Sequence, residues 1–124
     1  MDGAPPDPRV TAFWCQYLAI CETHMVPASA RPWYRQRLQR YIDAHPGIRL
    51  RAHTPAMVEA YLELQRQNLA MPGWQFRQAV DALRLLFCHL LQVSWGQEID
   101  WAHWKLGTRE PGVTPSILPG SSEA

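Results

Sequence analysis

The chain has few cysteines, a single lysine and no long hydrophobic run. Its cysteines, at positions 15, 21 and 88, are odd in number and form no Cys-x-x-Cys pair, which argues against disulfides and structural zinc and favours buried, reduced thiols. No apolar stretch approaches the ~18 residues that mark a membrane-spanning helix. The acidic, proline-rich start MDGAPPDPRV is also unlike a secretory signal. We therefore expect a cytoplasmic protein.

The sequence motifs of several large enzyme classes are absent as well. There is no G-x-G-x-x-G, G-x-x-x-x-G-K-[ST], H-E-x-x-H or G-x-S-x-G pattern, and the five histidines lack ligand spacing. His45 and His53 flank a turn and should be solvated, His89 should lie at the boundary of a core or inside it, and Asp100 should cap a turn. We predict no catalytic residue, no metal site and no cofactor.

The net charge of +1 conceals a basic middle between acidic ends. Residues 31–84 hold nine arginines and four acidic residues, a net charge of +5, whereas the rest of the chain holds three cations and seven acids, a net of −4. Such a middle can attract a polyanion. Eleven arginines to one lysine favour bidentate contacts to phosphate or guanine. Base composition of the gene could equally explain that ratio, although it does not explain the clustering.

Prolines, glycines and one capping threonine divide the chain into helices. Residues 1–8 read as a proline-rich leader, residues 9–106 as a helical domain and residues 107–124 as a flexible tail or interdomain linker. Helices are expected over residues 9–23, from Pro32 to about 44, from Thr54 as N-cap to about 68, and over 74–92. IDWAHW reads as a short helical turn or a packed arm. No strand pattern competes, so the fold class is all-α.

The segment 74–92 is the most informative helix. Its apolar residues recur at steps of three and four, which predicts a wide buried face and a central position in a small bundle; they are Phe76, Val80, Leu83, Phe87 and Leu90, widened by Ala79, Leu86 and Leu91. Its first turn instead carries Gln75, Arg77 and Gln78, side chains that can bond phosphates or base edges.

Six tryptophans offer either core packing or a platform for bases. Trp95, Trp101 and Trp104 lie among apolar residues, so we expect them to close the bottom of a small core rather than to stack on bases. Trp33 and Trp74 stand beside arginine or glutamine at helix starts. Core packing is the favoured interpretation for both, and packing against a sugar–phosphate backbone is the alternative.

The order of these features resembles one particular domain. The segments FWCQYLAICETHMVPASARPWYRQRLQRYIDAH, RLRAHTPAMVEAYLELQRQ, WQFRQAVDALRLLFCHLLQVSW and IDWAHW are similar to the N-terminal core-binding domain of integron integrases, within the tyrosine recombinase (phage integrase) family. The resemblance covers about residues 10–105, and its third segment is the most specific. It implies a compact SAM-like bundle of four to five helices that grips one face of duplex DNA during DNA integration and recombination.

In that family a separate C-terminal domain, with arginines, a lysine, histidines and a nucleophilic tyrosine, cuts the DNA. The four tyrosines here fall in predicted core stripes, so we expect no strand exchange by this chain, read as an excised domain or a truncated reading frame. The resemblance implies a DNA surface on the outer face of the second helix and the start of the fourth: Arg31, Arg35, Arg37 and Arg40, then Gln75, Arg77 and Gln78, with Arg49 and Arg51 in reserve.

The expected partner is double-stranded DNA, with other recombinase protomers in a larger assembly; the isolated domain should be monomeric. The alternative is an all-α protein–protein interaction module without nucleic-acid binding, which the nearly neutral total charge favours. Arg35, Arg40 and Arg77 on one contiguous face would favour DNA, whereas their scattering over opposite sides would favour the interaction module.

Overall fold

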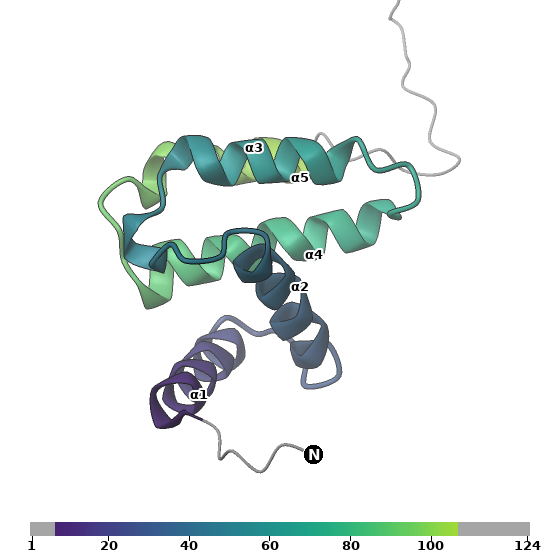
Figure 1. The fold of residues 1–124 in the computed structure, drawn as a ribbon. Coiled ribbons are helices and arrows are strands. Elements are labelled where there is room, and N and C mark those ends of the chain that lie inside the picture. The colour runs from purple at the N-terminus through teal and green to yellow at the C-terminus, as the bar shows by residue number, and fades with distance from the viewer. Residues whose placement is uncertain (1–6, 107–124) are drawn as a thin grey trace, which may run out of the picture.

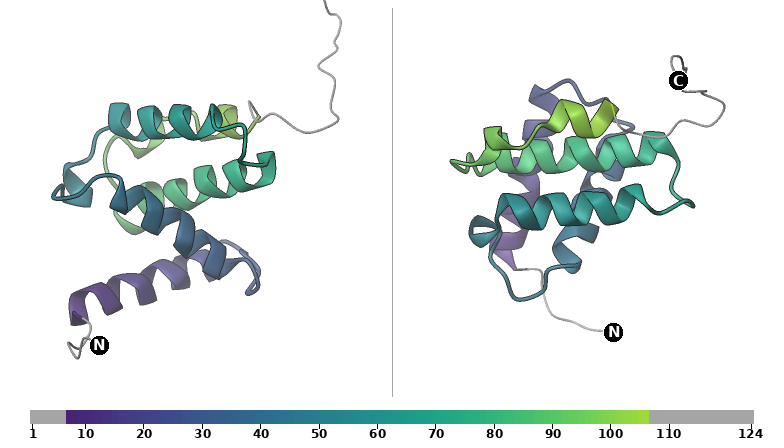
Figure 2. Two further views of the ribbon diagram at one scale, coloured as in Figure 1. Left: turned by 45° about the vertical axis from the view of Figure 1, so that its right-hand side comes forward. Right: turned by 90° about the horizontal axis from the view of Figure 1, so that it is seen from above.

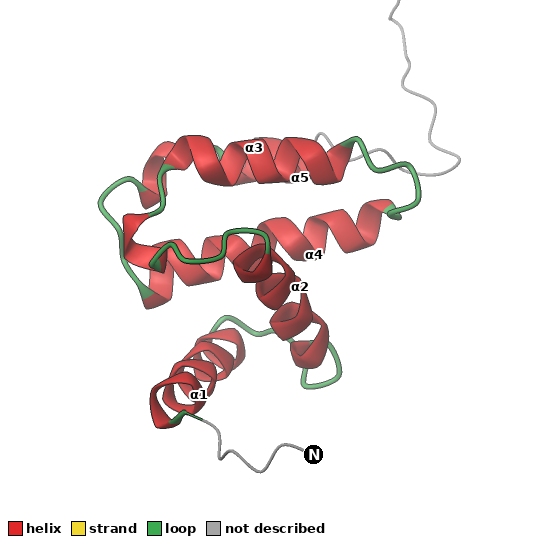
Figure 3. Ribbon diagram, in the orientation of Figure 1, coloured by secondary structure: helices red, strands yellow, loops and turns green. Residues whose placement is uncertain are grey.

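The computed structural model describes residues 7–106, and its regular structure there is entirely helical (Figure 3). The α-helices are α1 (Pro8–Thr23), α2 (Arg31–Asp43), α3 (Pro55–Arg66), α4 (Gly73–Arg84) and α5 (Trp101–Leu106). A π-helical segment (Leu85–Leu90) continues α4, and short 3-10 turns lie at Leu50–Ala52 and Gly96–Glu98. The all-α fold class is confirmed. None of the described helices is long and apolar enough to cross a membrane.

The helix starts follow the capping residues seen in the sequence. Thr54 caps α3, because its Oγ1 accepts a hydrogen bond from the backbone N–H of Met57 at 3.2 Å. Asp7 caps α1 through the N–H of Arg9, so the last two residues of the predicted leader, Asp7 and Pro8, belong to the first helix and its cap. Asp100 caps the start of α5, as expected, through the N–H of His103 at 3.0 Å. The rest of the leader and the predicted tail lie outside the described residues.

Helix α4 and its π-helical continuation form the centre of the bundle (Figures 1 and 2). Helices α3 and α5 lie on one side of it, and α1 and α2 on the other. Two tyrosine hydroxyls join the layers: Tyr17 of α1 donates to the carbonyl of Ala82 at 3.0 Å, and Tyr34 of α2 donates to Asp81 at 3.2 Å. The predicted central position of the fourth helix is confirmed.

The predicted buried face is confirmed as far as Phe87, whereas Leu90 and Leu91 are half-buried. The prediction of one uniform α-helix to Gln92 is wrong. The helix changes to π geometry at Leu85, where the N–H of Leu91 bonds to the carbonyl of Leu86 at 2.8 Å. Leu85, Leu86 and Phe87 are all fully buried. Three consecutive side chains point in widely different directions, so their burial requires neighbours around this segment, and α1 supplies one of them.

Trp95, Trp101 and Trp104 pack against the core as predicted, but not all at one end: the Trp104 ring lies 6.5 Å from that of Phe76 at the start of α4. The Trp95 ring lies 4.9 Å from that of Phe87, and the buried Trp101 donates its indole N–H to the carbonyl of Gly96 at 2.9 Å. A side chain at Gly96 would meet the sulfur of Cys88 at 3.2 Å, so this close approach favours glycine. Two tryptophan expectations are wrong: Trp33 and Trp74 are 47% and 48% exposed rather than core residues. The expectation of buried thiols also fails for Cys15, which is exposed.

His53 is a core residue, contrary to the prediction that it is solvated. It is 2% exposed, and its ring is held between the Tyr41 hydroxyl at 2.6 Å from Nδ1 and the carbonyl of Ile48 at 3.4 Å from Nε2. A carbonyl can only accept, so Nε2 carries the proton and Nδ1 accepts from Tyr41. His45 is half-buried, with Nδ1 2.8 Å from the backbone oxygen of Tyr41.

This burial predicts that the protein loses stability in mild acid. Burial lowers the pKa of His53, and His45 lowers it further, although the bond to Ile48 opposes both effects. The unfolded state therefore binds a proton first, so the free energy of unfolding is fully retained above pH ~6.5 and falls as the pH drops from there toward the lowered pKa. Urea unfolding at pH 7.5 and 5.0 measures this loss. We expect His53→Gln to reduce it and the exposed control His103→Gln to leave it unchanged; an equal loss in both variants would contradict the assignment.

Candidate nucleic-acid interface

Helix α2 concentrates positive charge. It holds four arginines, 31, 35, 37 and 40, and one acidic residue, Asp43. The Asp43 carboxylate accepts a hydrogen bond from the Gln39 amide at 2.9 Å rather than pairing with an arginine. Pro32 in the first turn lacks a backbone N–H that the helix start would leave unpaired in any case, so it favours a helix beginning here. The sequence thus builds a short helix with a net charge of +3.

Arg35 and Arg40 lie on the exposed side of α2. The guanidinium of Arg35 lies over the ring of Trp14 in α1, 4.8 Å from its centroid, which fixes one edge of this face. Residues five apart on an α-helix point about 140° apart, so Arg40 lies toward the opposite edge. The two arginines therefore flank the exposed face of α2 instead of forming one row.

Arg37 is buried, so the prediction that it contacts DNA from the outer face of the helix is wrong. Its side chain is 5% exposed, its Nε has no hydrogen-bond partner in the described residues, and its guanidinium lies over the Trp33 ring at 5.8 Å. Burial lowers the pKa of Arg37, and the neighbouring charge of Arg40 lowers it further. A duplex lying along the exposed face of α2 could not reach this group without movement of the helix.

Arg31 and the arginines of the arm that follows α2 (residues 44–54) differ in how exposed they are. Arg31 is half-buried, and its Nε donates to the carbonyl of Val26 at 3.0 Å, which ties it to the loop before the helix. Arg49 and Arg51 are both exposed; Arg51 donates one N–H to the carbonyl of Leu91 at 2.9 Å. Arg49 and Arg51, predicted as secondary DNA contacts, are therefore more accessible than Arg31 or Arg37.

The start of α4 is less open than the sequence suggested. Gln75, Arg77 and Gln78 are all half-buried, and the amide oxygen of Gln78 is buried without a partner in the described residues. This oxygen is therefore not exposed at the surface, and contact of Gln78 with a base edge stays a prediction. Helices α2 and α4 do pack against each other, as the predicted surface requires. Arg35, for its part, contacts Trp14 of α1.

Four cations outside this region, Arg9, Arg66, Arg84 and Lys105, are compensated by carboxylates. Arg9 pairs with Asp7 at 3.4 Å, Arg66 pairs with Glu63, and Asp81 pairs with both Arg84 at 3.4 Å and Lys105 at 3.1 Å. Within residues 7–106, by contrast, six consecutive arginines of the sequence form no ion pair with a carboxylate: 31, 35, 37, 40, 49 and 51. Uncompensated positive charge thus gathers on α2 and the arm after it.

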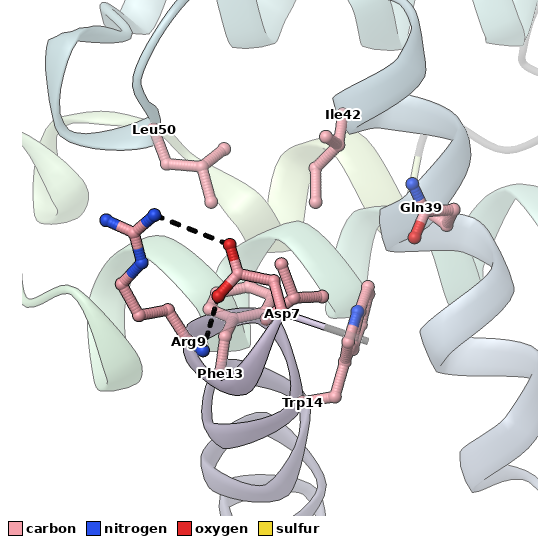
Figure 4. A pocket seen from close by; sticks show the side chains of 8 residues that line it. Asp7, Arg9, Phe13, Trp14, Gln39, Ile42 and Leu50 are labelled. Carbon is pink, nitrogen blue, oxygen red and sulfur yellow. Dashed lines mark hydrogen bonds and ion pairs between the residues drawn. The ribbon is translucent and has the colours of Figure 1, made fainter. Parts of the chain in front are cut away.

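A separate hollow lies between α1, the end of α2 and Leu50 (Figure 4). This groove of about 440 Å³ is lined mainly by apolar side chains, and the Asp7–Arg9 ion pair stands at its edge; the apolar lining is Val10, Phe13, Trp14, Ile42 and Leu50. Its chemistry suits an apolar surface rather than phosphate. Among the residues that the structure describes, no group of three or more histidines, cysteines or carboxylates could hold a metal ion.

Comparison of the chain with protein-family models, with curated proteins and with solved structures gives no match. The likeness to the core-binding domain of integron integrases therefore rests on the sequence segments quoted above.

Proposed function

We propose that this chain binds double-stranded DNA, as a DNA-binding domain of a site-specific tyrosine recombinase of the integron or phage integrase type. The observation that carries the proposal is the set of arginines on α2 and the following arm that no carboxylate of the described residues neutralises. Arginine forks suit phosphate oxygens, so these contacts would position a duplex. The sequence resemblance supplies the family.

Four exposed arginines would make the phosphate contacts: 35, 40, 49 and 51. Gln75 and Arg77, half-buried on α4, are the side chains left to contact a base edge, while Arg31 would orient the start of α2. DNA cleavage in this family belongs to a separate domain, so the activity that we propose is binding, without catalysis or a cofactor.

Fluorescence anisotropy with a labelled duplex of about 30 base pairs tests this function. If about four phosphates are neutralised, the affinity should fall roughly 100-fold between 50 and 200 mM salt. Each phosphate contact contributes about −0.9 to the slope of the logarithm of the binding constant against the logarithm of the salt concentration. Absence of binding at both salt concentrations, with circular dichroism showing a folded helical protein, would contradict the proposal.

The second candidate is the all-α protein-interaction module. The apolar groove between α1 and α2 favours it, since Val10 and other apolar side chains line a hollow that DNA phosphates would not use. The positions of Arg35 and Arg40 at opposite edges of α2, rather than in one row, also favour it. This candidate gives no duplex binding in the same titration, so the one experiment separates the two functions.

A further inference from the structure

Arg37 and Arg40 of α2 and Tyr61 of α3 are close enough to affect one another electrostatically. Arg37 and Arg40 are three residues apart, so they are neighbours on one side of the helix. The ring of Tyr61 in α3 meets that of Tyr41, the residue after Arg40, edge to face, with centroids 5.0 Å apart. Arg37 and Tyr41 are four residues apart and share one side of α2, so Tyr61 packs against the side of the helix that carries Arg37.

None of these three groups has a polar partner in the part of the chain that the structure describes. Arg37 and Arg40 form no ion pair there, the buried Nε of Arg37 forms no hydrogen bond, and neither does the Tyr61 hydroxyl. Arg37 as a whole residue is 5% exposed, and burying its Nε costs free energy, because this N–H loses water without gaining an acceptor. Its position indicates a ligand that completes the cluster.

Groups of this cluster also change the pKa values of Tyr61 and Arg37. Burial raises the pKa of Tyr61, while the charges of Arg40 and Arg37 lower it. Arg40 in turn lowers the pKa of Arg37, as expected of two nearby cations. An anion placed between them would relieve this repulsion.

We propose that Arg37, Arg40 and Tyr61 form a binding site for a phosphomonoester dianion, supplied either as inorganic phosphate or as a nucleoside monophosphate. A phosphomonoester carries a charge of about −1.5 to −2 at neutral pH, which matches two guanidiniums, whereas a backbone phosphodiester carries one. Guanidinium forks and a phenol O–H are suitable donors for its oxygens. Trp33, 47% exposed and next to Arg37, offers a ring on which a base could stack.

Isothermal titration of the full chain with inorganic phosphate, adenosine monophosphate and adenosine tests this site. Phosphate and the monophosphate should bind at pH 7.5 and more weakly at pH 5.5, since the second phosphate pKa is about 6. Adenosine should not bind. Tighter binding of the monophosphate than of phosphate, lost in Trp33→Ala, identifies the nucleotide as the ligand; equal binding identifies free phosphate.

Variants separate the site from general attraction to arginine. Arg40→Ala, on the surface, should weaken phosphate binding by about tenfold or more, and Tyr61→Phe should weaken it less. Arg35→Ala, an exposed arginine on the same helix but outside the cluster, should leave it unchanged. No binding of either phosphate compound at millimolar concentration, or equal weakening by Arg35→Ala and Arg40→Ala, would overturn the proposal. Arg40 is shared with the proposed duplex surface, so Tyr61→Phe and Arg35→Ala distinguish the two proposals: the first should weaken only phosphate binding and the second only duplex binding.

Discussion

Replacing Phe87 with alanine should lower the free energy of unfolding by about 3–5 kcal/mol, as large-to-small changes at buried aromatic residues do. Phe87 is fully buried, and its ring lies next to those of Tyr41 at 6.0 Å, His53 at 6.1 Å and Trp95 at 4.9 Å. The substitution removes the ring shared by α2, the segment before α3 and the chain after the π-helical segment. No single neighbour can fill the resulting space.

Urea unfolding followed by far-UV circular dichroism measures this effect. Leu64→Ala is the matched control, because Leu64 is an exposed residue of α3 and its loss should change stability by no more than about 0.5 kcal/mol. Phe87→Leu keeps part of the buried volume and should show a smaller loss, which remains measurable if the alanine variant does not fold. A loss below about 1 kcal/mol for Phe87→Ala would show that this residue is not at the centre of the core.

The double variant Arg35→Ala/Arg40→Ala should weaken duplex binding by roughly two orders of magnitude at 50 mM salt. Each phosphate contact makes the logarithm of the binding constant fall by about 0.9 for every tenfold rise in salt concentration, because bound counterions are released. This contribution grows as the salt concentration falls from 1 M to 50 mM, so losing two contacts lowers the binding constant at 50 mM by about 2.3 powers of ten. Both side chains are exposed, and neither has a carboxylate partner in the described residues. Anisotropy titration of the labelled duplex measures the change.

The charge-matched control is Arg9→Ala/Arg66→Ala. It removes the same two positive charges from α1 and α3, where Asp7 and Glu63 compensate them. This control should bind DNA nearly as well as the natural sequence. If both double variants lose affinity equally, total charge governs binding and α2 is not the interface.

The sequence predicted the helices well because their boundaries depend on local chemistry. Thr54 followed by Pro55, and Pro32 in a first turn, act within a few residues and need no tertiary context. The apolar period of α4 likewise reports directly which face is buried. The π-helical geometry at Leu85–Leu90 was missed, because it depends on packing around the whole segment.

The side chains of the site were harder to predict. A long side chain can run along an apolar surface, so Arg37 is buried beside core residues although its charge suggests exposure. His53 is hydrogen-bonded to Tyr41, twelve residues earlier in the chain, and no local sequence pattern predicts that hydrogen bond. The ion pair between Asp81 and Lys105 likewise emerges only from packing α5 against α4, whereas Arg84 is three residues from Asp81 on the same helix. Charge clustering was visible in the sequence, whereas the distinction between paired and unpaired cations required the structure.

The most direct test of the central claim is the salt dependence of duplex affinity for the natural sequence and the Arg35→Ala/Arg40→Ala variant. The logarithm of the binding constant, plotted against the logarithm of the salt concentration, should have a slope near −3.6 for the natural sequence and near −1.8 for the variant, at about −0.9 per phosphate. A slope near zero for the natural sequence, or equal slopes for both proteins, would contradict DNA binding through the arginines of α2.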